Sequence, residues 1–199
     1  MTRYEMEIIV PQGIDKIAFI SDIHGLYENL LKTLELKPEI RYWFCAGDVV
    51  DMYAPTHFNA PTVRLMTKLK IPSTVGNHDR YIRKNAFNLF EPESQEYLKD
   101  MPLFMDIKFA RFRIGVFHAT PSSLDDFIQD TSEESLFERT FGHLEFDIFI
   151  LGHTHRHFSR SIGDKQFINP GALGLRNKDS TFCTLDETGK VEFIFLNQH

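Results

Sequence analysis

The first half of the chain alternates short apolar runs with segments of helical spacing. The runs Lys16–Ser21, Tyr42–Ala46 and Pro72–Val75 have the length and composition of buried strands. Between them, Leu26–Leu36 carries apolar residues three and four positions apart, and Val63–Leu69 follows the same spacing. This pattern predicts strand, helix, strand, helix and strand in that order.

The second half of the chain is richer in predicted strands. Glu93–Lys99 favours a short helix, and Thr131 with Glu134 forms a capping-box pattern that predicts a helix to about Phe141. Turn residues at 163–164 and 187–189 separate several of the later apolar runs. The predicted strands are Leu103–Phe109, Arg111–Phe117, Asp147–Leu151, 156–162, 165–169, 180–185 and 191–196.

Strand–helix alternation followed by hairpins is typical of an α/β (α+β) chain with one mixed sheet or two sheets covered by helices. No internal repeat and no Pro/Gly/Ser-rich linker interrupts the pattern, so we expect a single domain over residues 1–199. Residues 1–15 are an N-terminal extension to the first predicted core strand. Within that extension, residues 4–10 are a candidate edge strand.

Composition narrows the class of protein. A chain of 199 residues with 42% hydrophobic and 25% charged residues can bury a core, which excludes a disordered protein. The net charge of −6 argues against a broad nucleic-acid or anionic-lipid surface. No apolar run approaches the roughly 18 residues of a membrane span, and the N-terminus lacks the apolar core of a signal peptide. Cys45 and Cys183 lie in apolar runs, which indicates reduced core thiols and a cytoplasmic protein.

Polar residues follow five of the apolar runs directly. Because sites form beyond the carboxyl ends of neighbouring strands in α/β sheets, these side chains are expected to converge on one pocket. The candidate residues are Asp22, His24, Asp48, Asn77, His78, Asp79, His118, His153 and His155. In an extended chain, residues two apart face the same side, so Asp22/His24 and His153/His155 would each present two ligands. Glycines 47, 76 and 152 would let the backbone turn sharply before them.

Imidazole, carboxylate and amide donors suit manganese, iron or zinc. The donors outnumber the needs of one ion, so we expect two divalent ions bridged by the Asp48 carboxylate. Such a pair, about 3.5–4 Å apart, can hold a hydroxide and clamp a phosphoryl group for in-line attack. Two ions, two carboxylates and one hydroxide leave a net charge of about +1, which attracts an anion even in an acidic protein.

These motifs, in this order, resemble the calcineurin-like metallophosphoesterase superfamily. They are Asp22-x-His24, Gly47-Asp48, Gly76-Asn-His-Asp79, His118 and Gly152-His-Thr-His155. The resemblance runs from about residue 16 to the C-terminus. Asn169-Pro-Gly171 and the short length are similar to its small YfcE-like phosphodiesterase branch.

The resemblance implies two mixed sheets in a sandwich flanked by helices, and a role for each motif residue. Asp22, His24, Asp48 and His155 would hold one metal, and Asp48, Asn77, His118 and His153 the other. His78 would touch the phosphate or protonate the leaving oxygen, with Asp79 orienting its ring. Leu26 and Ala172 depart from the residues common in relatives, but neither is a ligand position.

Asn77 and His78 are candidates for binding the substrate as well. Three arginines, Arg80, Arg83 and Arg176, are candidates for binding the substrate phosphate, with plain solvent exposure as the alternative. Met52-Tyr53 stands where phosphoprotein phosphatases of the superfamily carry an arginine, which weakens the protein-phosphatase hypothesis.

The sequence therefore predicts a binuclear metal-dependent phosphodiesterase that hydrolyses a small soluble phosphodiester or nucleotide. Manganese is the first choice of metal, with iron, zinc and nickel as alternatives. A phosphomonoesterase or protein phosphatase with the same site is the second hypothesis. A protein-binding scaffold is the third, although the intact ligand set argues against it, and a nuclease is disfavoured by the negative charge. We expect no membrane partner, and a homo-oligomer stays open.

Overall fold

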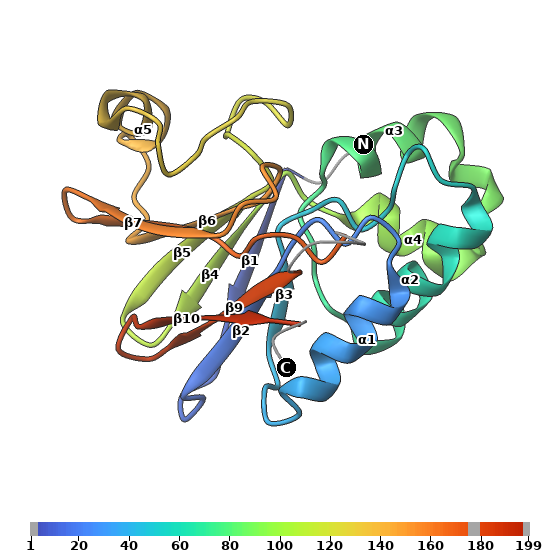
Figure 1. Cartoon of the computed structure of the whole chain (residues 1–199), viewed down its shortest axis with the longest axis horizontal. Coiled ribbons are helices and arrows are strands. Elements are labelled where there is room, and N and C mark those ends of the chain that lie inside the picture. The colour runs from blue at the N-terminus through green and yellow to red at the C-terminus, as the bar shows by residue number, and fades with distance from the viewer. Residues whose placement is uncertain (1–3, 175–179, 197–199) are drawn as a thin grey trace.

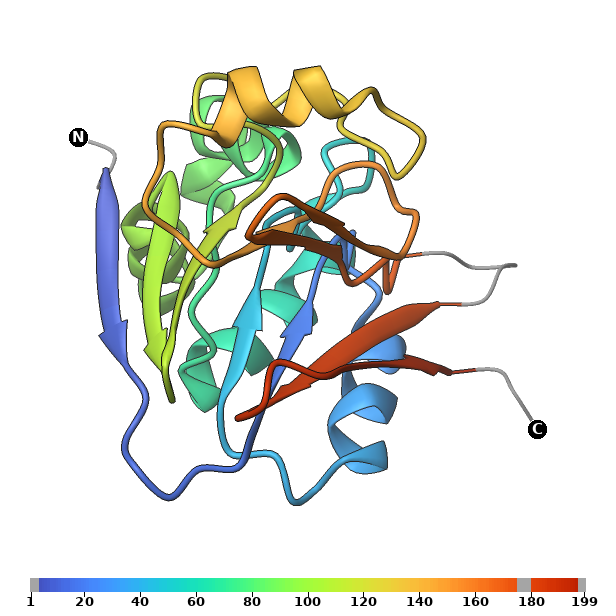
Figure 2. The ribbon, with the colours of Figure 1, turned by 90° about the vertical axis from the view of Figure 1, so that its left-hand side faces the viewer.

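Two β-sheets pack face to face in the computed structural model, which describes residues 4–174 and 180–196 (Figures 1 and 2). The six-stranded sheet runs in the order β1 (Glu5–Ile9), β4 (Phe104–Phe109), β5 (Phe112–Phe117), β6 (Ile148–Leu151), β8 (Lys165–Asn169) and β7 (Phe158–Ile162). The four-stranded sheet runs in the order β10 (Val191–Phe195), β9 (Thr181–Asp186), β2 (Lys16–Ile20) and β3 (Trp43–Cys45). The sandwich of two mixed sheets is confirmed.

Helices cover the outer faces of both sheets. Four helices and a 3₁₀ turn lie beside the four-stranded sheet, and one further helix lies over the six-stranded sheet (Figure 1). They are α1 (Tyr27–Leu36), α2 (Thr56–Leu69), α3 (Asn77–Asn85), η1 (Phe87–Leu89), α4 (Pro92–Asp100) and α5 (Glu134–Phe141).

The core consists of three apolar layers. Phe19, Phe44 and Ile150 are buried between the two sheets. Leu30 of α1 lies in the layer between the helices and the four-stranded sheet, and Phe141 of α5 lies in the layer on the outer face of the six-stranded sheet. Each such large apolar side chain contributes about 1.5–3 kcal/mol when fully buried, so these layers hold the strand ends rigidly in place.

The N-terminal strand is confirmed. β1 pairs in parallel with β4 at one edge of the six-stranded sheet. β4 and β5 are antiparallel neighbours, also as predicted. Cys45 and Cys183 are both buried free thiols.

Three local predictions were wrong. Pro72–Val75 forms a single bridge, Cys45 to Ser73, in place of a strand; Pro72 has no N–H to donate to a ladder. α2 begins at Thr56, seven residues before the predicted start, because its first turns carry polar residues and Pro61 that mask the helical pattern. The Thr131 capping box is absent: Glu133 occupies the N-cap of α5 and makes no side-chain cap bond.

One helix, α3, was not predicted. Residues 77–79 were interpreted only as the tail of a strand and residues 80–85 were given no element, yet Asp79 at the third helical position accepts a hydrogen bond from the backbone of Gly76. An acidic first turn and a basic last turn at Arg83 and Lys84 are the sequence signals that indicate this helix.

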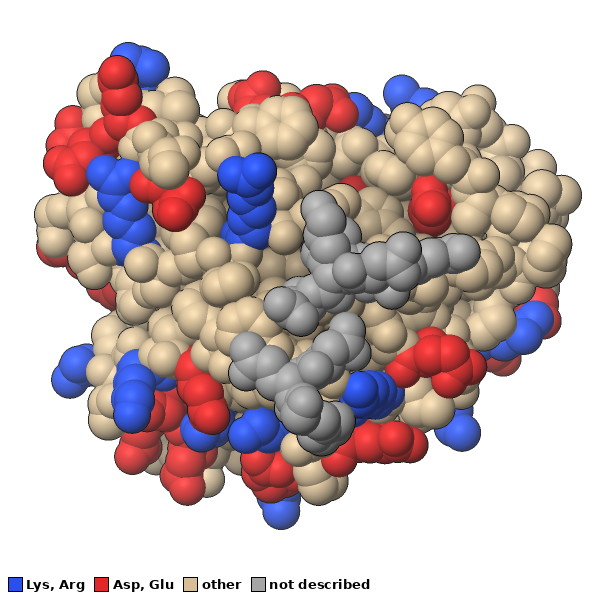
Figure 3. Space-filling view, in the orientation of Figure 1, with Lys and Arg blue, Asp and Glu red and all other residues tan. Residues whose placement is uncertain are grey.

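Surface charge is mixed. On the face shown in Figure 3, Lys and Arg lie interspersed with Asp and Glu along the lower edge and at the upper left. Among the described residues, every helix is too short or too polar to cross a bilayer.

Candidate metal centre

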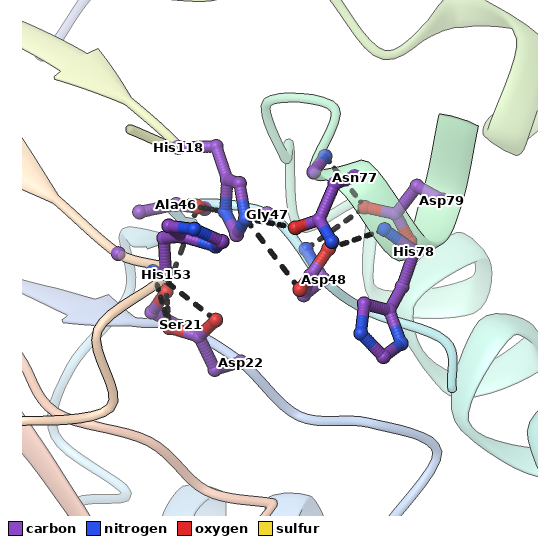
Figure 4. A network of polar contacts seen from close by, with 12 residues as sticks. Ser21, Asp22, Ala46, Gly47, Asp48, Asn77, His78, Asp79, His118 and His153 are labelled. Atoms are coloured by element: carbon purple, nitrogen blue, oxygen red, sulfur yellow. Dashed lines mark hydrogen bonds and ion pairs between the residues drawn. The ribbon is translucent and has the colours of Figure 1, made fainter. Parts of the chain in front are cut away.

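The predicted ligands meet at the carboxyl edge of both sheets. Asp22 and His24 follow β2, Asp48 follows β3, and His118 follows β5. β2 and β3 are parallel, as are β5 and β6, so these strands end at the same edge of the sandwich. Asn77 and His78 enter from the first turn of α3 (Figure 4). His153 and His155 come from the loop after β6.

Three groups of three potential ligands form at this edge, and two of them match the predicted metal sites. The ligand atoms of Asp22, His24 and His155 lie within 4.8 Å of one another. Those of Asp48, His118 and His153 do the same.

Asp48, a member of the second group, also faces the first. Its Oδ2 is 3.5 Å from His118 Nε2 and 3.9 Å from His24 Nε2. Figure 4 shows Asp48 central, with His118 and His153 on one side and His78 on the other. One carboxylate therefore faces both groups of ligands, as a bridging residue must.

The backbone turns at the site in an unusual way. Asp22, His24, Asp48, His153 and His155 all adopt positive φ, between 47° and 67°. Few non-glycine residues enter this left-handed region, and it costs about 1–3 kcal/mol each. The expectation that Asp22/His24 and His153/His155 sit in extended chain was wrong, because left-handed turns aim these side chains at the centre. Strain gathered on the candidate ligands is typical of a functional site.

The ring orientation of His118 fits a metal ligand. Its Nδ1 lies 2.8 Å from the carbonyl oxygen of Ala46, so Nδ1 carries the proton. Nε2 therefore presents a lone pair, and it faces the Asp48 carboxylate at 3.5 Å and Asn77 Oδ1 at 3.0 Å. A lone pair facing a carboxylate is stabilised by a cation between them. A backbone carbonyl that fixes the tautomer in this way is the usual partner of a metal-binding histidine.

Two further observations support metal binding. His153 Nε2 is buried and has no hydrogen-bond partner among the described residues, whereas buried polar atoms are normally paired. His24 Nε2 and His155 Nε2 lie 3.0 Å apart, so two imidazoles converge on one point. The residues present therefore fit divalent ions.

Burial sets the charge state of this site. It lowers the pKa of His24 and of His118 to about 4, so both rings are neutral near pH 7 and free to bind metal. Burial is the largest single effect and would raise the pKa of Asp22, but the hydrogen bond with His155 and the nearby rings of His118, His155 and His24 together outweigh it and lower the pKa to about 2. Burial, with Asp79 and Asp22 nearby, raises the pKa of Asp48 well above its ordinary value.

Asp79 does not orient the ring of His78, contrary to expectation. Its carboxylate accepts hydrogen bonds from the backbone N–H groups of Asp48 (2.9 Å), Gly76 (2.9 Å) and Val50 (3.2 Å). Asp79 thus fixes the loop that carries Asp48 to the start of α3, and it is a positioning residue.

The His78 ring is held by other groups. The backbone N–H of Met52 donates to His78 Nδ1 at 3.1 Å, and Asp51 Oδ1 lies 3.5 Å from the same nitrogen. The neutral ring therefore carries its proton on Nε2. Sequence reasoning missed this contact, because it depends on the backbone of the loop after Asp48. His78 also groups with His24 and Asp48 as a third candidate metal cluster.

Hydrogen bonds from Asn169 hold the loop that carries His153, and the sequence analysis assigned Asn169 no role in the site. Asn169 Nδ2 donates to the carbonyl oxygen of Gly152 at 2.8 Å and to Thr154 Oγ1 at 3.1 Å. The Asn-Pro-Gly motif was visible in the sequence, but its contact was not. Ser21 Oγ donates to Asp22 Oδ2 at 2.5 Å.

The candidate arginines lie apart from the ligand groups. Arg80 pairs with Asp125 at 2.7 Å, and Arg83 donates to the carbonyl oxygen of Met101 at 3.0 Å. Both line a cavity of about 490 Å³ with Phe104 and Phe146, which contains none of the predicted ligands. Arg176 lies outside the described residues.

Of the three predicted turn glycines, only Gly47 has a positive φ, +94°. Gly76 and Gly152 are needed for a different reason, which is that a side chain at either position would collide with its neighbours. A Cβ on Gly76 would lie 2.0 Å from Asp48 Oδ1, and one on Gly152 would lie 2.2 Å from Ser21 Oγ. The backbone must approach the ligand residues closely at both positions.

Gly76→Ala is expected to lower the free energy of unfolding by about 2–4 kcal/mol, because the new methyl group overlaps the Asp48 carboxylate. Urea unfolding of the metal-depleted protein measures the loss. Gly163→Ala is the control: a Cβ there meets nothing within 4 Å, and only its φ of +60° opposes alanine. Equal losses in the two variants would contradict the steric explanation.

A family model described as the calcineurin-like phosphoesterase superfamily domain matches residues 16–190. The chain belongs to this family. A search of curated protein sequences finds no match.

Solved structures share the fold at low sequence identity. A hypothetical protein from Pyrococcus horikoshii OT3 has a TM-score of 0.76 at 19% identity, over 90% of this chain and 87% of that one. A novel archaeal phosphodiesterase has a TM-score of 0.63 at 21% identity, over 90% and 99% of the two chains. YfcE, a phosphoesterase from E. coli, has a TM-score of 0.56 at 19% identity, over 92% and 100%.

Proposed function

We propose that this protein is a binuclear metal-dependent phosphodiesterase that acts on a small phosphodiester or nucleotide, with manganese as the metal and the cytoplasm as its place of action. The observation that carries the proposal is the pair of three-ligand groups that the Asp48 carboxylate connects, as a member of one group that also lies 3.9 Å from His24 Nε2 of the other. The family supports phosphoester hydrolysis, and a preference for diesters is supported by a structural neighbour that is itself an archaeal phosphodiesterase.

Each group of ligands would hold one ion. Asp22, His24 and His155 would form one site, and His118 and His153, with Asn77, the other; Asp48 would contribute to both. Divalent ions bound here would polarise the phosphoryl oxygens and lower the pKa of the attacking water. The chain itself orients these ligands: left-handed turns direct the side chains toward the centre, and the Ala46 carbonyl fixes the His118 tautomer.

His78 is proposed to assist the leaving group. Since Met52 N–H occupies Nδ1, the Nε2–H of His78 is the donor available to the substrate. Hydrolysis breaks one P–O ester bond, and a hydrogen bond or proton from Nε2 would stabilise the negative charge that develops on the departing oxygen.

Manganese added to the metal-depleted protein is expected to raise its melting temperature and to start hydrolysis of bis(p-nitrophenyl) phosphate. Binding at a concentration 100 times the dissociation constant stabilises a protein by about 2.7 kcal/mol, which corresponds to roughly 5–10 °C at this size. Thermal scans with and without Mn²⁺, and release of p-nitrophenolate, measure the two effects. The proposal is excluded if manganese, iron, zinc and nickel all fail to produce a thermal shift and also fail to produce turnover. Faster turnover of p-nitrophenyl phosphate would favour a monoesterase.

A further inference from the structure

Two exposed aromatic side chains stand at the rim of the metal centre. Tyr53 is 83% exposed and Phe127 is 61% exposed, which is uncommon for such large apolar groups. They lie in different loops, 74 positions apart in the sequence, yet each contacts a histidine of the candidate site.

The two contacts lie on opposite sides of the centre. The Tyr53 ring meets the His78 ring edge-on, with centroids 5.7 Å apart. The Phe127 ring leans over the His153 ring, with centroids 4.5 Å apart and planes at 40°. Figure 4 shows His78 and His153 on opposite sides of Asp48.

We propose that Tyr53 and Phe127 form two aromatic subsites for the two ester groups of a phosphodiester, which makes a nucleoside ester the fitting substrate class. This inference rests on the proposed function. A diester carries one organic group on each side of its phosphorus, and the site offers one exposed ring on each side. The ring beside His78 receives the leaving group, because His78 Nε2–H is the donor for the departing oxygen, and Phe127 receives the retained group.

The charges near the two aromatic rings narrow the class of substrate further. Asp51 Oδ1 accepts a hydrogen bond from the backbone N–H of Tyr53, and Asp126, next to Phe127, accepts one from Thr120. These carboxylates repel additional phosphates. An uncharged aromatic group such as a nucleoside therefore fits each ring better than a nucleotide with further phosphates.

Two substrates with the same leaving group test the Phe127 subsite: thymidine 5′-(p-nitrophenyl phosphate) and methyl p-nitrophenyl phosphate. Base stacking on an aromatic ring contributes about 1–3 kcal/mol, so we expect the wild type to prefer the thymidine ester by about tenfold or more in kcat/KM. Phe127→Leu is expected to bring this ratio close to one, chiefly through KM. Tyr53→Leu should lower kcat/KM for both esters in parallel, and Tyr53→Phe should restore it.

Tyr4→Leu is the matched control. Tyr4 is 67% exposed and also meets an aromatic ring edge-on, but that ring is Phe104 of β4. Calorimetry adds a readout that needs no turnover: thymidine 5′-monophosphate should bind the manganese-loaded wild type more tightly than methyl phosphate does, and Phe127→Leu should remove the difference. An unchanged ester ratio and unchanged binding in Phe127→Leu would overturn the subsites. A binding difference without turnover would overturn the proposed function alone.

Discussion

Asp48→Asn is expected to lose bound metal and phosphodiesterase activity together, with kcat/KM reduced by about 10³-fold or more. The variant keeps the size and shape of the side chain but removes the negative charge between the two ligand groups. Metal ions supply several kcal/mol of transition-state stabilisation, and each ~1.4 kcal/mol is a factor of ten in rate. Metal content by elemental analysis and hydrolysis of bis(p-nitrophenyl) phosphate measure the two losses.

The same substitution is expected to stabilise the metal-free protein near pH 7. Burial raises the folded-state pKa of Asp48 above its unfolded value, so the ionised carboxylate opposes folding and a neutral amide does not. As the pH falls through the raised pKa, the folded wild type binds a proton that the unfolded chain does not yet hold. The advantage of Asp48→Asn should therefore shrink with falling pH and vanish below the unfolded value of 3.8.

Asp106→Asn is the control for both experiments. Asp106 is also buried, but it pairs with Arg113 at 2.8 Å in the six-stranded sheet. Its loss should destabilise the fold and leave the metal content of the folded protein unchanged. Full metal content in Asp48→Asn would show that Asp48 does not bridge the ions.

His78→Ala is expected to keep bound metal and to lower kcat by about 10²–10⁴-fold, the usual effect of removing a positioned proton donor. The loss should grow as the leaving group becomes more basic, because a good leaving group such as p-nitrophenolate needs little help. Rates over a series of aryl esters, with metal content measured on the same samples, give the comparison.

His57→Ala, at an exposed position in α2, should change neither quantity. Equal dependence on the leaving group in wild type and His78→Ala would mean that Nε2–H binds a non-bridging phosphoryl oxygen. Loss of one metal ion in His78→Ala would mean that the third cluster, with His24 and Asp48, is a true ligand set.

The residue types and their order were enough to select side chains that the structure brings together in candidate metal clusters. Each of Asp22, Asp48, His118 and His153 directly follows an apolar run, or one glycine after it, and parallel strands end at a common edge. The family match over residues 16–190 agrees with the resemblance to the calcineurin-like phosphoesterases that these motifs indicated. Local patterns were less informative where polar residues and Pro61 masked the start of α2.

The sequence by itself determined where most strands lie along the chain and which chemical donors follow them, because these depend on short-range patterns of apolar and polar residues. Those patterns left one mixed sheet or two sheets open, and only the resemblance to the family implied two. Only the tertiary structure decided how the donors are aimed. The left-handed turns at the candidate ligands, the hydrogen bonds that Asp79 accepts from three backbone N–H groups, and the placement of Tyr53 and Phe127 beside His78 and His153 all depend on contacts between distant segments. These contacts form only when the two sheets pack together, so the spacing of residues along the chain cannot predict them.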